Sequence, residues 1–371
     1  MAESFGQSRG EFAVSAAVFM LVFGIASPMV GLLADRLGPK KTILLGVALT
    51  GSSFLAGAAF NSFPVFVLAY GVVAAFGLTA MSYVPMGVLV DQTVSARHRG
   101  LAYGTLTNGA AIGFMVLSPI WILIQESYSW REVYWFLGLF FLAPMWIAVY
   151  FAMPAQATTP VQSAPIQPLK TRMAFIFSSR PLIVLMFGFF GCGVTMAFID
   201  VHMVAHLQDL KLTPGQIGIA MSVLGATELI GGFAAGWLCD RYPKSYVISA
   251  FYLLRAIALL VIFLMPNMTG VWLFAALFGL SYLGTVVGTS VYALGLFGPA
   301  NKGFAFGFIW LAHQIGAFAS TQLGANAFDW FGNYEWTIAV TAIVAVISAL
   351  VSIAWLAPNP EPTPIPSLPK Q

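Results

Sequence analysis

Long apolar runs alternate along the chain with short polar stretches. Eleven runs are each long enough to cross a bilayer as a helix, which takes about 20 apolar residues. No strand-like alternation of period two recurs, so helices rather than strands are indicated. The runs cover residues 12–34, 42–60, 65–90, 100–124, 133–153, 182–205, 217–238, 246–265, 271–297, 303–328 and 337–357. The pattern predicts an all-α polytopic membrane protein.

The runs fall into two groups, with five before and six after an interruption. Residues 154–180 are rich in Pro, Gln, Thr and Ser, which is typical of a linker. We therefore expect a five-helix bundle over residues 1–153 and a six-helix bundle over residues 181–357. The Pro-rich residues 358–371 predict a tail outside both bundles.

Composition narrows the class of protein further. Only 8% of the 371 residues are charged and 59% are apolar, with a mean hydropathy of +0.88. Soluble domains carry roughly 25% charged residues, so a soluble enzyme, a nucleic-acid binder and a disordered regulator are excluded. The net charge of +3 comes from short clusters between the runs, which indicates a lipid bilayer and no nucleic acid as partner. Cys192 and Cys239 lie in or at the end of apolar runs and predict buried thiols rather than a disulfide.

Lysines and arginines gather on one side of the predicted bundles. Arg9, Arg131 and Lys211 fall on the opposite side, and Arg255 lies within a run. Basic loops of membrane proteins face the cytoplasm, so the sequence predicts a cytoplasmic linker and C-terminus, with residues 1–11 outside. The remaining basic residues are Arg36, Lys40, Lys41, Arg97, Arg99, Lys170, Arg172, Arg180, Arg241, Lys244, Lys302 and Lys370.

The two halves of the chain are similar to each other at an offset of 203 to 206 residues. Parallel repeats of this kind are typical of membrane transporters. The matching pairs are residues 31–36 with 236–241, residues 99–104 with 302–307, Gly113 with Gly316, and Trp130 with Trp336.

The repeat predicts that the first half is one helix short. Asp35 closes the first run of its half, whereas the matching Asp240 closes the second run. Halves related by an axis along the membrane normal must start on the same side, which a five-helix half does not. We therefore expect a shortened form of a twelve-helix protein, with a lipid-accessible groove in the first bundle. A mis-assigned start and a deliberate fragment fit equally well, and a genuine eleven-helix protein is the alternative.

A dense motif of glycines and charges joins the first two runs. Its residues are Gly31, Asp35, Arg36, Gly38, Lys40 and Lys41, echoed in the second half by Asp240 and Arg241. The motif resembles the loop signature between helices two and three of the major facilitator superfamily. The resemblance implies a secondary transporter working by alternating access, in which this cluster latches the two bundles together on the cytoplasmic side. A carboxylate here can accept hydrogen bonds from a neighbouring helix N-terminus. The alternative is that the basic residues only set the topology.

Residues 97–109 resemble the helix-five signature of monocarboxylate transporters, in a bacterial branch of the superfamily, with Leu106 and Asn108 where alanines are usual. The resemblance implies proton-coupled transport of a small organic anion, such as a monocarboxylate, across a bacterial cell membrane. We expect a monomer. The resemblance also implies an acid followed one helical turn later by an Arg in helix eight. Glu228 matches the acid, whereas Gly232 stands where the Arg would be.

Glu228 and Arg255 are ionisable residues near the middle of two consecutive, antiparallel runs. An ionised side chain there costs about 2.5–3.5 kcal/mol on insertion scales. Their distances along the helices from the nearest loops place them roughly 18 Å and 16 Å deep, so they can meet. We expect Glu228 to carry a proton and Arg255 to support it or an anionic substrate. The alternative is a static buried ion pair.

Asp200, His202 and His206 lie near the outer end of the sixth run. The two histidines are four residues apart and share a helix face. Histidine titrates near pH 6.5, which suits proton exchange with the exterior, so we expect these residues in an outer vestibule. The alternatives are a plain polar helix end and a metal site, for which two ligands are too few.

Further polar side chains lie inside the runs. Substrate sites of repeat-built transporters lie near the midplane between the repeats, so we expect these side chains to line the cavity. Each is equally consistent with a hydrogen bond between helices. They are Tyr83, Asn108, Tyr282, Thr285, Tyr292, His313 and Gln314. Pro85 and Pro119 predict kinks in their helices.

Other classes of membrane protein lack support in the sequence. There is no His-Glu-x-x-His, and intramembrane acids and histidines are few, which argues against an intramembrane enzyme. There is no Gly-x-x-x-x-Gly-Lys-Ser/Thr, so ATP does not drive transport within this chain. We expect no cofactor and no metal. The remaining alternative is a truncated, non-transporting or sensor-like membrane protein.

Overall fold

The computed structural model describes residues 1, 3–7, 9–154, 168–298 and 301–361, which are helical and contain no strand. The helices of the first half are α1 (Arg9–Leu37), α2 (Pro39–Ala59), α3 (Phe63–Phe66), η2 (Val67–Ala74), α4 (Ala75–Ala80), α5 (Tyr83–Thr93), α6 (Arg99–Ser127), α7 (Trp130–Phe140), η4 (Phe141–Met145) and α8 (Trp146–Ala152). Those of the second half are α9 (Leu169–Phe177), α10 (Arg180–Asp209), α11 (Pro214–Arg241), α12 (Lys244–Leu264), α13 (Met268–Leu296), α14 (Lys302–Phe331) and α15 (Glu335–Trp355). The short helices η1 (Glu3–Phe5) and η3 (Ala96–His98) complete the set.

Every apolar run predicted from the sequence coincides with a helical segment. Ten segments of the described chain are long and apolar enough to cross a membrane. The remaining run, residues 100–124, coincides with α6, a helix of 29 residues that continues through Pro119. The chain is therefore an all-α polytopic membrane protein with five segments before α9 and six after it.

The segments form two bundles. In the second bundle α10 packs on α14 and α15, α11 packs on α13, and α12 packs on α13 and α15. In the first bundle α2 packs on α7 and on the segment that runs from α3 to α5, while α1 lies against α2 and that same segment. Between the bundles, α1 packs on α14 and α6 packs on α11.

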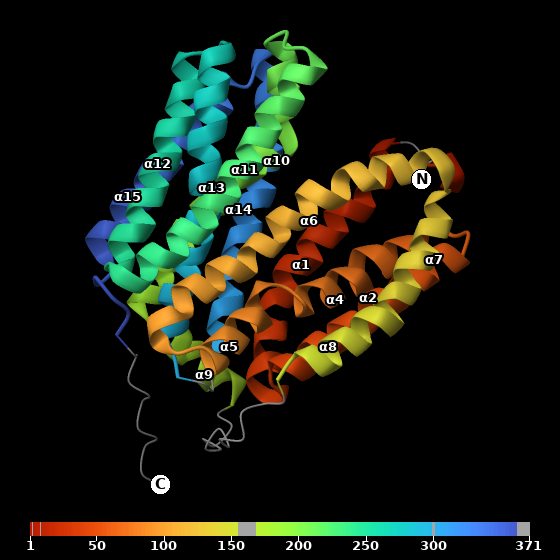
Figure 1. Ribbon diagram of the computed structural model, residues 1–371, viewed down its shortest axis with the longest axis horizontal. Coiled ribbons are helices and arrows are strands. Elements are labelled where there is room, and N and C mark those ends of the chain that lie inside the picture. Colours follow the sequence, from red (N-terminus) through yellow and green to blue (C-terminus); the bar gives the residue numbers. More distant parts are fainter. Residues whose placement is uncertain (2, 8, 155–167, 299–300, 362–371) are drawn as a thin grey trace.

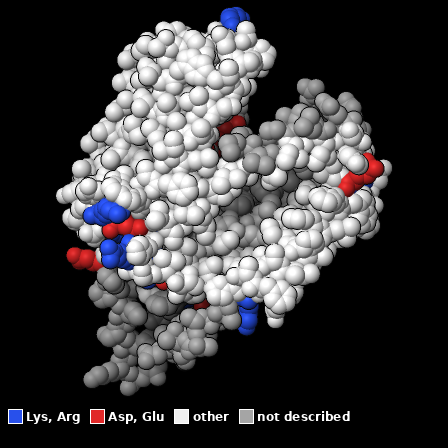
Figure 2. Space-filling view, in the orientation of Figure 1, with Lys and Arg blue, Asp and Glu red and all other residues white. Residues whose placement is uncertain are grey.

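The bundles meet near one end of the molecule and spread apart toward the other, as Figure 1 shows. We call the joined end the basic end, because α1, α5 and α11 finish there and α6 and α14 begin there with Arg99 and Lys302. We call the opposite end the open end. The space-filling view shows a hollow between the two arms and few charged side chains on their surfaces (Figure 2). The hollow gives a path from the open end to the middle of the molecule.

Pairs of glycines join the bundles near the basic end. A Cβ on Gly31 of α1 would overlap the backbone of Gly303 in α14, and a Cβ on Gly100 of α6 would overlap the carbonyl of Gly236 in α11. Small residues at such crossings let helix backbones approach closely. Gly38 has a φ of 83°, a left-handed conformation that favours glycine, where the chain turns from α1 into α2.

The third segment, from α3 to α5, is interrupted about halfway across the bundle. Helix α4 ends at Ala80, Met81 and Ser82 are not helical, and α5 begins at Tyr83. Pro85 has no N–H to donate to the carbonyl four residues earlier, and its ring crowds that carbonyl. The kink predicted at Pro85 is therefore a complete break in the helix.

The predicted linker contains a helix that the sequence pattern did not indicate. Residues 155–167 lie outside the described part of the chain, whereas α9 follows at once and packs against α10. The predicted tail also begins with an attached stretch, because Ser245 N donates to the Pro358 carbonyl over 3.2 Å. Residues 362–371, including Lys370, lie outside the described residues.

One face of α6 is open. The repeat mates Gly113 and Gly316 differ sharply in their surroundings, since a Cβ on Gly316 would overlap the Phe190 carbonyl of α10. A Cβ on Gly113 or on Gly109 would meet nothing within 4 Å. Nearby Ile112 is 47% exposed. Helix α10 thus covers α14 at a place where the corresponding position of α6 has no atom within 4 Å.

Candidate functional site

Two carboxylates from the predicted motif bind helix N-termini of the opposite bundle. Asp35, at the end of α1, accepts from Gly303 N over 2.7 Å and from Phe304 N over 2.9 Å at the start of α14. Asp240, at the end of α11, accepts from Gly100 N over 2.7 Å and from Leu101 N over 2.9 Å at the start of α6. An anion is favoured at a helix N-terminus by the helix dipole and by the unpaired N–H groups. The two contacts join positions that the sequence repeat matches, and together they hold the basic end closed.

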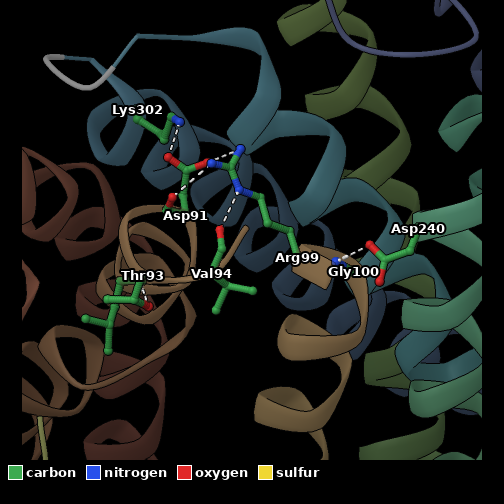
Figure 3. A network of polar contacts seen from close by, with 8 residues as sticks. Asp91, Thr93, Val94, Arg99, Gly100, Asp240 and Lys302 are labelled. Carbon is green, nitrogen blue, oxygen red and sulfur yellow. Dashed lines mark hydrogen bonds and ion pairs between the residues drawn. The ribbon is translucent and has the colours of Figure 1, made fainter. Parts of the chain in front are cut away.

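A second layer of charges reinforces this end. Figure 3 shows Asp91, near the end of α5, between Arg99 and Lys302. Arg99 Nη1 lies 2.9 Å from Asp91 Oδ1, and Lys302 Nζ forms an ion pair with Asp91 Oδ2. Because Lys302 begins α14, Asp91 ties the first bundle to the second.

The α9 helix contributes a third contact. Arg172 Nη2 lies 3.1 Å from Asp35 Oδ2, and Arg172 Nε donates to Asn301 Oδ1 over 2.7 Å. Burial lowers the pKa of the Arg172 guanidinium, and the Asp35 carboxylate opposes that shift. The pairing leaves Asp35 with a cationic partner in addition to the two N–H groups.

The basic residues of the motif do not pair with its carboxylates. Lys40 Nζ donates to the Met153 carbonyl over 2.8 Å, and the Arg241 guanidinium lies 4.2 Å from the Trp237 ring centroid. Arg36 and Lys41 are exposed and have no hydrogen bond or ion pair within the described part of the chain. The carboxylates of the motif are bound instead by Arg172 and by helix N-termini.

Arg255 lies at the centre of the second bundle and is 0% exposed. Its Nη1 donates to Thr195 Oγ1 over 2.9 Å and to Cys192 Sγ over 3.3 Å. Its Nη2 donates to the carbonyls of Ser281 and Tyr282 over 2.9 and 2.8 Å and to Thr285 Oγ1 over 2.9 Å. Buried neutral acceptors from α10 and α13 therefore hold this cation.

Glu228 and Arg255 form no ion pair, contrary to the pairing expected from their similar depth. Arg255 turns toward α10 and α13, whose hydroxyl and carbonyl oxygens accept from both of its Nη atoms, while its Nε has no partner in the described chain. The Glu228 carboxylate makes no hydrogen bond within the described chain, and its side chain is only partly buried. It lies within electrostatic range of both Asp200 and Arg255. Glu228 is thus a carboxylate without a fixed partner at mid-depth.

Asp200 is exposed, and Tyr282 donates to its Oδ1 over 2.8 Å. The two histidines expected beside it in an outer vestibule are buried instead, with 7% and 6% exposure for His202 and His206. His202 Nε2 lies 3.0 Å from the Thr321 carbonyl of α14, and both rings lie near Tyr334. Their shared face turns into the second bundle, because α14 covers it. Of the three residues, only Asp200 faces solvent.

Tyr292 also lies elsewhere than expected. It is 0% exposed and donates to the Ala357 carbonyl over 3.1 Å, near the basic end. It therefore does not line a cavity at the midplane.

Aromatic rings from both bundles stack at mid-depth. Tyr83 of α5 lies parallel to Trp310 of α14, with ring centroids 4.7 Å apart and an interplanar angle of 6°. Trp310 also contacts Phe189 and His313, at centroid distances of 5.1 and 5.2 Å. Trp310 Nε1 and both ring nitrogens of His313 are buried without a hydrogen-bond partner in the described structure. Gln314 packs against Gly24 of α1.

Two departures from the monocarboxylate-transporter pattern, Asn108 in place of an alanine and Gly232 in place of an arginine, lie next to each other in the structure. Its Nδ2 donates to the Leu229 carbonyl over 3.0 Å. A Cβ on Gly232 would overlap its Oδ1. Asn108 therefore occupies the space beside position 232 that a larger side chain would need.

Sequence reasoning missed several residues of these networks. Asp91 had a usable signal, since it is an acid at the end of an apolar run. Arg172 and Trp310 had none, because Arg172 lies in the predicted linker and Trp310 resembles an ordinary apolar position. Within the described residues, no group of three His, Cys, Asp or Glu side chains could hold a metal ion.

Comparison with known proteins finds similar sequences among membrane transporters. The family model of the Major Facilitator Superfamily matches residues 1–207 and 185–371. An uncharacterized MFS-type transporter of Bacillus subtilis, YcxA, is 31% identical over 367 residues, which cover 95% of this chain and 88% of that protein. Monocarboxylate transporter 12 of Mus musculus is 23% identical over 359 residues, covering 88% of this chain and 74% of the mouse protein.

Solved structures share the fold at low sequence identity. The fucose:proton symporter FucP of E. coli superposes with a TM-score of 0.71 at 15% identity, covering 94% of this chain and 92% of FucP. The human organic anion transporter MFSD10 gives a TM-score of 0.73 at 17% identity, covering 95% and 87% of the two chains. The family match over both halves, together with the paired helix-end contacts and the YcxA relative, shows that this chain belongs to the major facilitator superfamily.

Proposed function

We propose that this transporter carries a small organic anion, such as a monocarboxylate, together with a proton across a bacterial plasma membrane. One observation carries the proposal. Tyr282 donates to the exposed Asp200 over 2.8 Å, and Glu228 lies within electrostatic range of both Asp200 and Arg255. The function needs no chemical conversion of the substrate, and we propose that a monomer performs it.

Charge balance at this site supports coupling to a proton. With both acids ionised, the three groups carry one net negative charge, and an incoming anion would add another. Like charges in a weakly polar interior repel strongly. Protonation of Asp200 or Glu228 removes that repulsion, so proton and anion favour each other's binding. Such coupling is reciprocal by thermodynamic linkage.

The closed basic end supports alternating access. Asp35 and Asp240 hold that end shut while the other end is open. Basic loops face the cytoplasm, so we propose that this state is open to the outside and that the C-terminus is cytoplasmic. The names of similar proteins support transport of a small organic anion with a proton, since they include monocarboxylate transporter 12, an organic anion transporter and a fucose:proton symporter.

The open face of α6 favours a second candidate function. Gly109 and Gly113 face empty space where the repeat mate of α6 carries a packed helix. A protein whose first bundle leaves this helix face uncovered could bind its ligand and signal without transporting it. Uptake distinguishes the two functions.

The test is uptake of labelled lactate, pyruvate and other small acids into proteoliposomes at two external pH values. We expect uptake above that of protein-free liposomes, and faster uptake at the more acidic external pH. Movement of neutral solutes alone would contradict the anion assignment. Binding of an acid without any uptake would favour the sensor.

A further inference from the structure

Arg255 does not offer its charge to a substrate. It is 0% exposed, and both Nη atoms donate to groups of its own bundle. Only its Nε is left without a partner in the described chain, and the side chain that carries it is closed off from the hollow. An anion that enters the hollow therefore needs hydrogen-bond donors from other residues. The described part of the chain has such donors at the same depth, at the break between α4 and α5 in the third segment.

Helix α5 begins at this break with unpaired N–H groups. The N-cap residue, Ser82, accepts no hydrogen bond from the helix, because its hydroxyl donates to the Thr79 carbonyl over 2.7 Å. Ser82 has an extended backbone, with φ −85° and ψ −162°, so the N–H groups of Tyr83 and Val84 in the first turn of α5 face no carbonyl of a preceding helical turn. Val84 is nevertheless only 1% exposed. Buried N–H groups in proteins are nearly always paired. Pro85, the next residue, has no N–H.

A second observation points to the same place. Trp310 Nε1 is a donor only, has no partner and belongs to a side chain that is 6% exposed. Its ring lies 4.7 Å from that of Tyr83, the first residue of α5. The adjacent His313, 7% exposed, also has both ring nitrogens unpaired. Trp310 of α14 and the first residue of α5 are therefore neighbours across the two bundles, and the Trp310 Nε1 donor is buried without a partner in the described chain.

The direction of α5 is favourable for an anion. The helix has 11 residues and runs from the break toward the basic end, where Asp91 binds Lys302. Its N-terminus, the positive end of the helix dipole, therefore points away from the closed end. Ten residues separate Tyr83 from Thr93, which is about 15 Å along the helix. The break is thus near the depth of Arg255.

We propose that the N-terminus of α5, with Trp310 Nε1, is the site that binds the carboxylate of the transported acid. This inference rests on the proposed function. Discontinuous helices in membrane transporters present their N-termini to anionic groups in the same way. The site is formed by α5 of one bundle and α14 of the other, so a carboxylate bound there contacts both.

Two substitutions test the site. In Ser82→Asp a carboxylate enters the N-cap and can accept from the free N–H groups, so it competes with the substrate. We expect initial lactate uptake to fall at least tenfold, with no loss of thermal stability. Trp310→Phe keeps the ring stack and removes the N–H. We expect its KM for lactate to rise about tenfold, the effect of losing one charge-assisted hydrogen bond, with the pH dependence of uptake unchanged.

Ser62→Asp is the matched control. Ser62 is the N-cap of α3, at the other end of the same segment, and likewise makes no side-chain cap bond. We expect wild-type uptake from this variant. Unchanged KM values for lactate in both Ser82→Asp and Trp310→Phe would overturn the inference. If Ser82→Asp fails to fold, the KM of Trp310→Phe decides.

Direct binding of lactate to the detergent-solubilised protein separates this inference from the proposed function. Lactate binding that Ser82→Asp abolishes, without proton-coupled uptake by the wild type, would support the site and contradict the transport proposal. Proton-coupled uptake with wild-type KM values in both variants would support the transport proposal and contradict the site.

Discussion

At the scale of single residues, Asn108 and Gly232 form a matched pair across the two bundles. Asn108 reaches from α6 to the Leu229 carbonyl, and the absence of a Cβ at Gly232 gives its amide room. Neither residue is informative alone, since an Asn in a membrane helix commonly bonds to a neighbour. Together they account for the missing arginine in α11.

A double-mutant cycle measures this pairing. Gly232→Ala alone should destabilise the protein by about 1–3 kcal/mol, because the new methyl group displaces the Asn108 amide. In the Asn108→Ala background the same substitution should be neutral or stabilising, since alanine favours helix over glycine by about 0.5–1 kcal/mol. Thermal unfolding in detergent of the four proteins gives the coupling energy. Equal effects of Gly232→Ala in both backgrounds would contradict the pairing.

Sequence reasoning located most polar residues but not their directions. Depth along a helix follows from residue number, so Glu228 and Arg255 are indeed ionisable groups inside their segments. The face that a side chain presents depends on neighbouring helices, which no periodicity in one apolar run reveals. His202 and His206 therefore turn out to be buried against α14, and Tyr292 bonds near the basic end.

At the scale of elements, the two helix-end contacts share one geometry but differ in strength. Asp240 accepts from two N–H groups of α6. Asp35 makes the equivalent contacts with α14 and additionally pairs with Arg172 of α9. Breaking a buried pair by neutralising one partner leaves an uncompensated charge. The contact at Asp35 should therefore contribute more to closure of the basic end.

Neutralising each carboxylate tests this difference. Asp240→Asn keeps a cap but loses the charge, which should cost the closed basic end about 1 kcal/mol. Asp35→Asn should shift the equilibrium further, because the Arg172 guanidinium also loses its carboxylate counter-ion. Distances between spin labels at Lys41→Cys and Tyr242→Cys report opening of the basic end. A larger shift for Asp240→Asn than for Asp35→Asn would contradict the role of α9.

The segments themselves were readable from the sequence to within a few residues, because crossing a bilayer requires about 20 apolar positions. Two elements were not. Helix α9 follows a Pro-rich stretch that is typical of a linker. The break before α5 was predicted only as a kink at Pro85, since the effect of a proline on a helix depends on what replaces the lost hydrogen bond.

At the scale of the whole molecule, the sequence repeat allows matching positions of the two bundles to be compared. Gly316 lies where α14 touches α10, whereas Gly113 faces open space on α6. The asymmetry could be predicted from the count of apolar runs, because the first half is one segment short of the second. The spread of the bundles at the open end could not be, since it depends on how α1 packs on α14 and α6 on α11.

Matched alanine substitutions test the asymmetry. Gly316→Ala should lower stability by about 1–3 kcal/mol through overlap with the Phe190 carbonyl. Gly113→Ala should leave stability unchanged or raise it by up to about 1 kcal/mol, because alanine favours helix. Thermal unfolding in one detergent provides the comparison. A loss of stability in Gly113→Ala similar to that in Gly316→Ala would mean that α6 is covered at this position.

The central claim is that Glu228 couples a proton to the movement of an anion, and the pH inside vesicles tests it most directly. Proteoliposomes loaded with a pH-sensitive dye are given an inward lactate gradient, and protein-free liposomes correct for passive entry of lactic acid. We predict lumenal acidification with the wild type and its loss in Glu228→Gln. Lactate uptake without acidification, or a Glu228→Gln protein that still acidifies the vesicles, would contradict the claim.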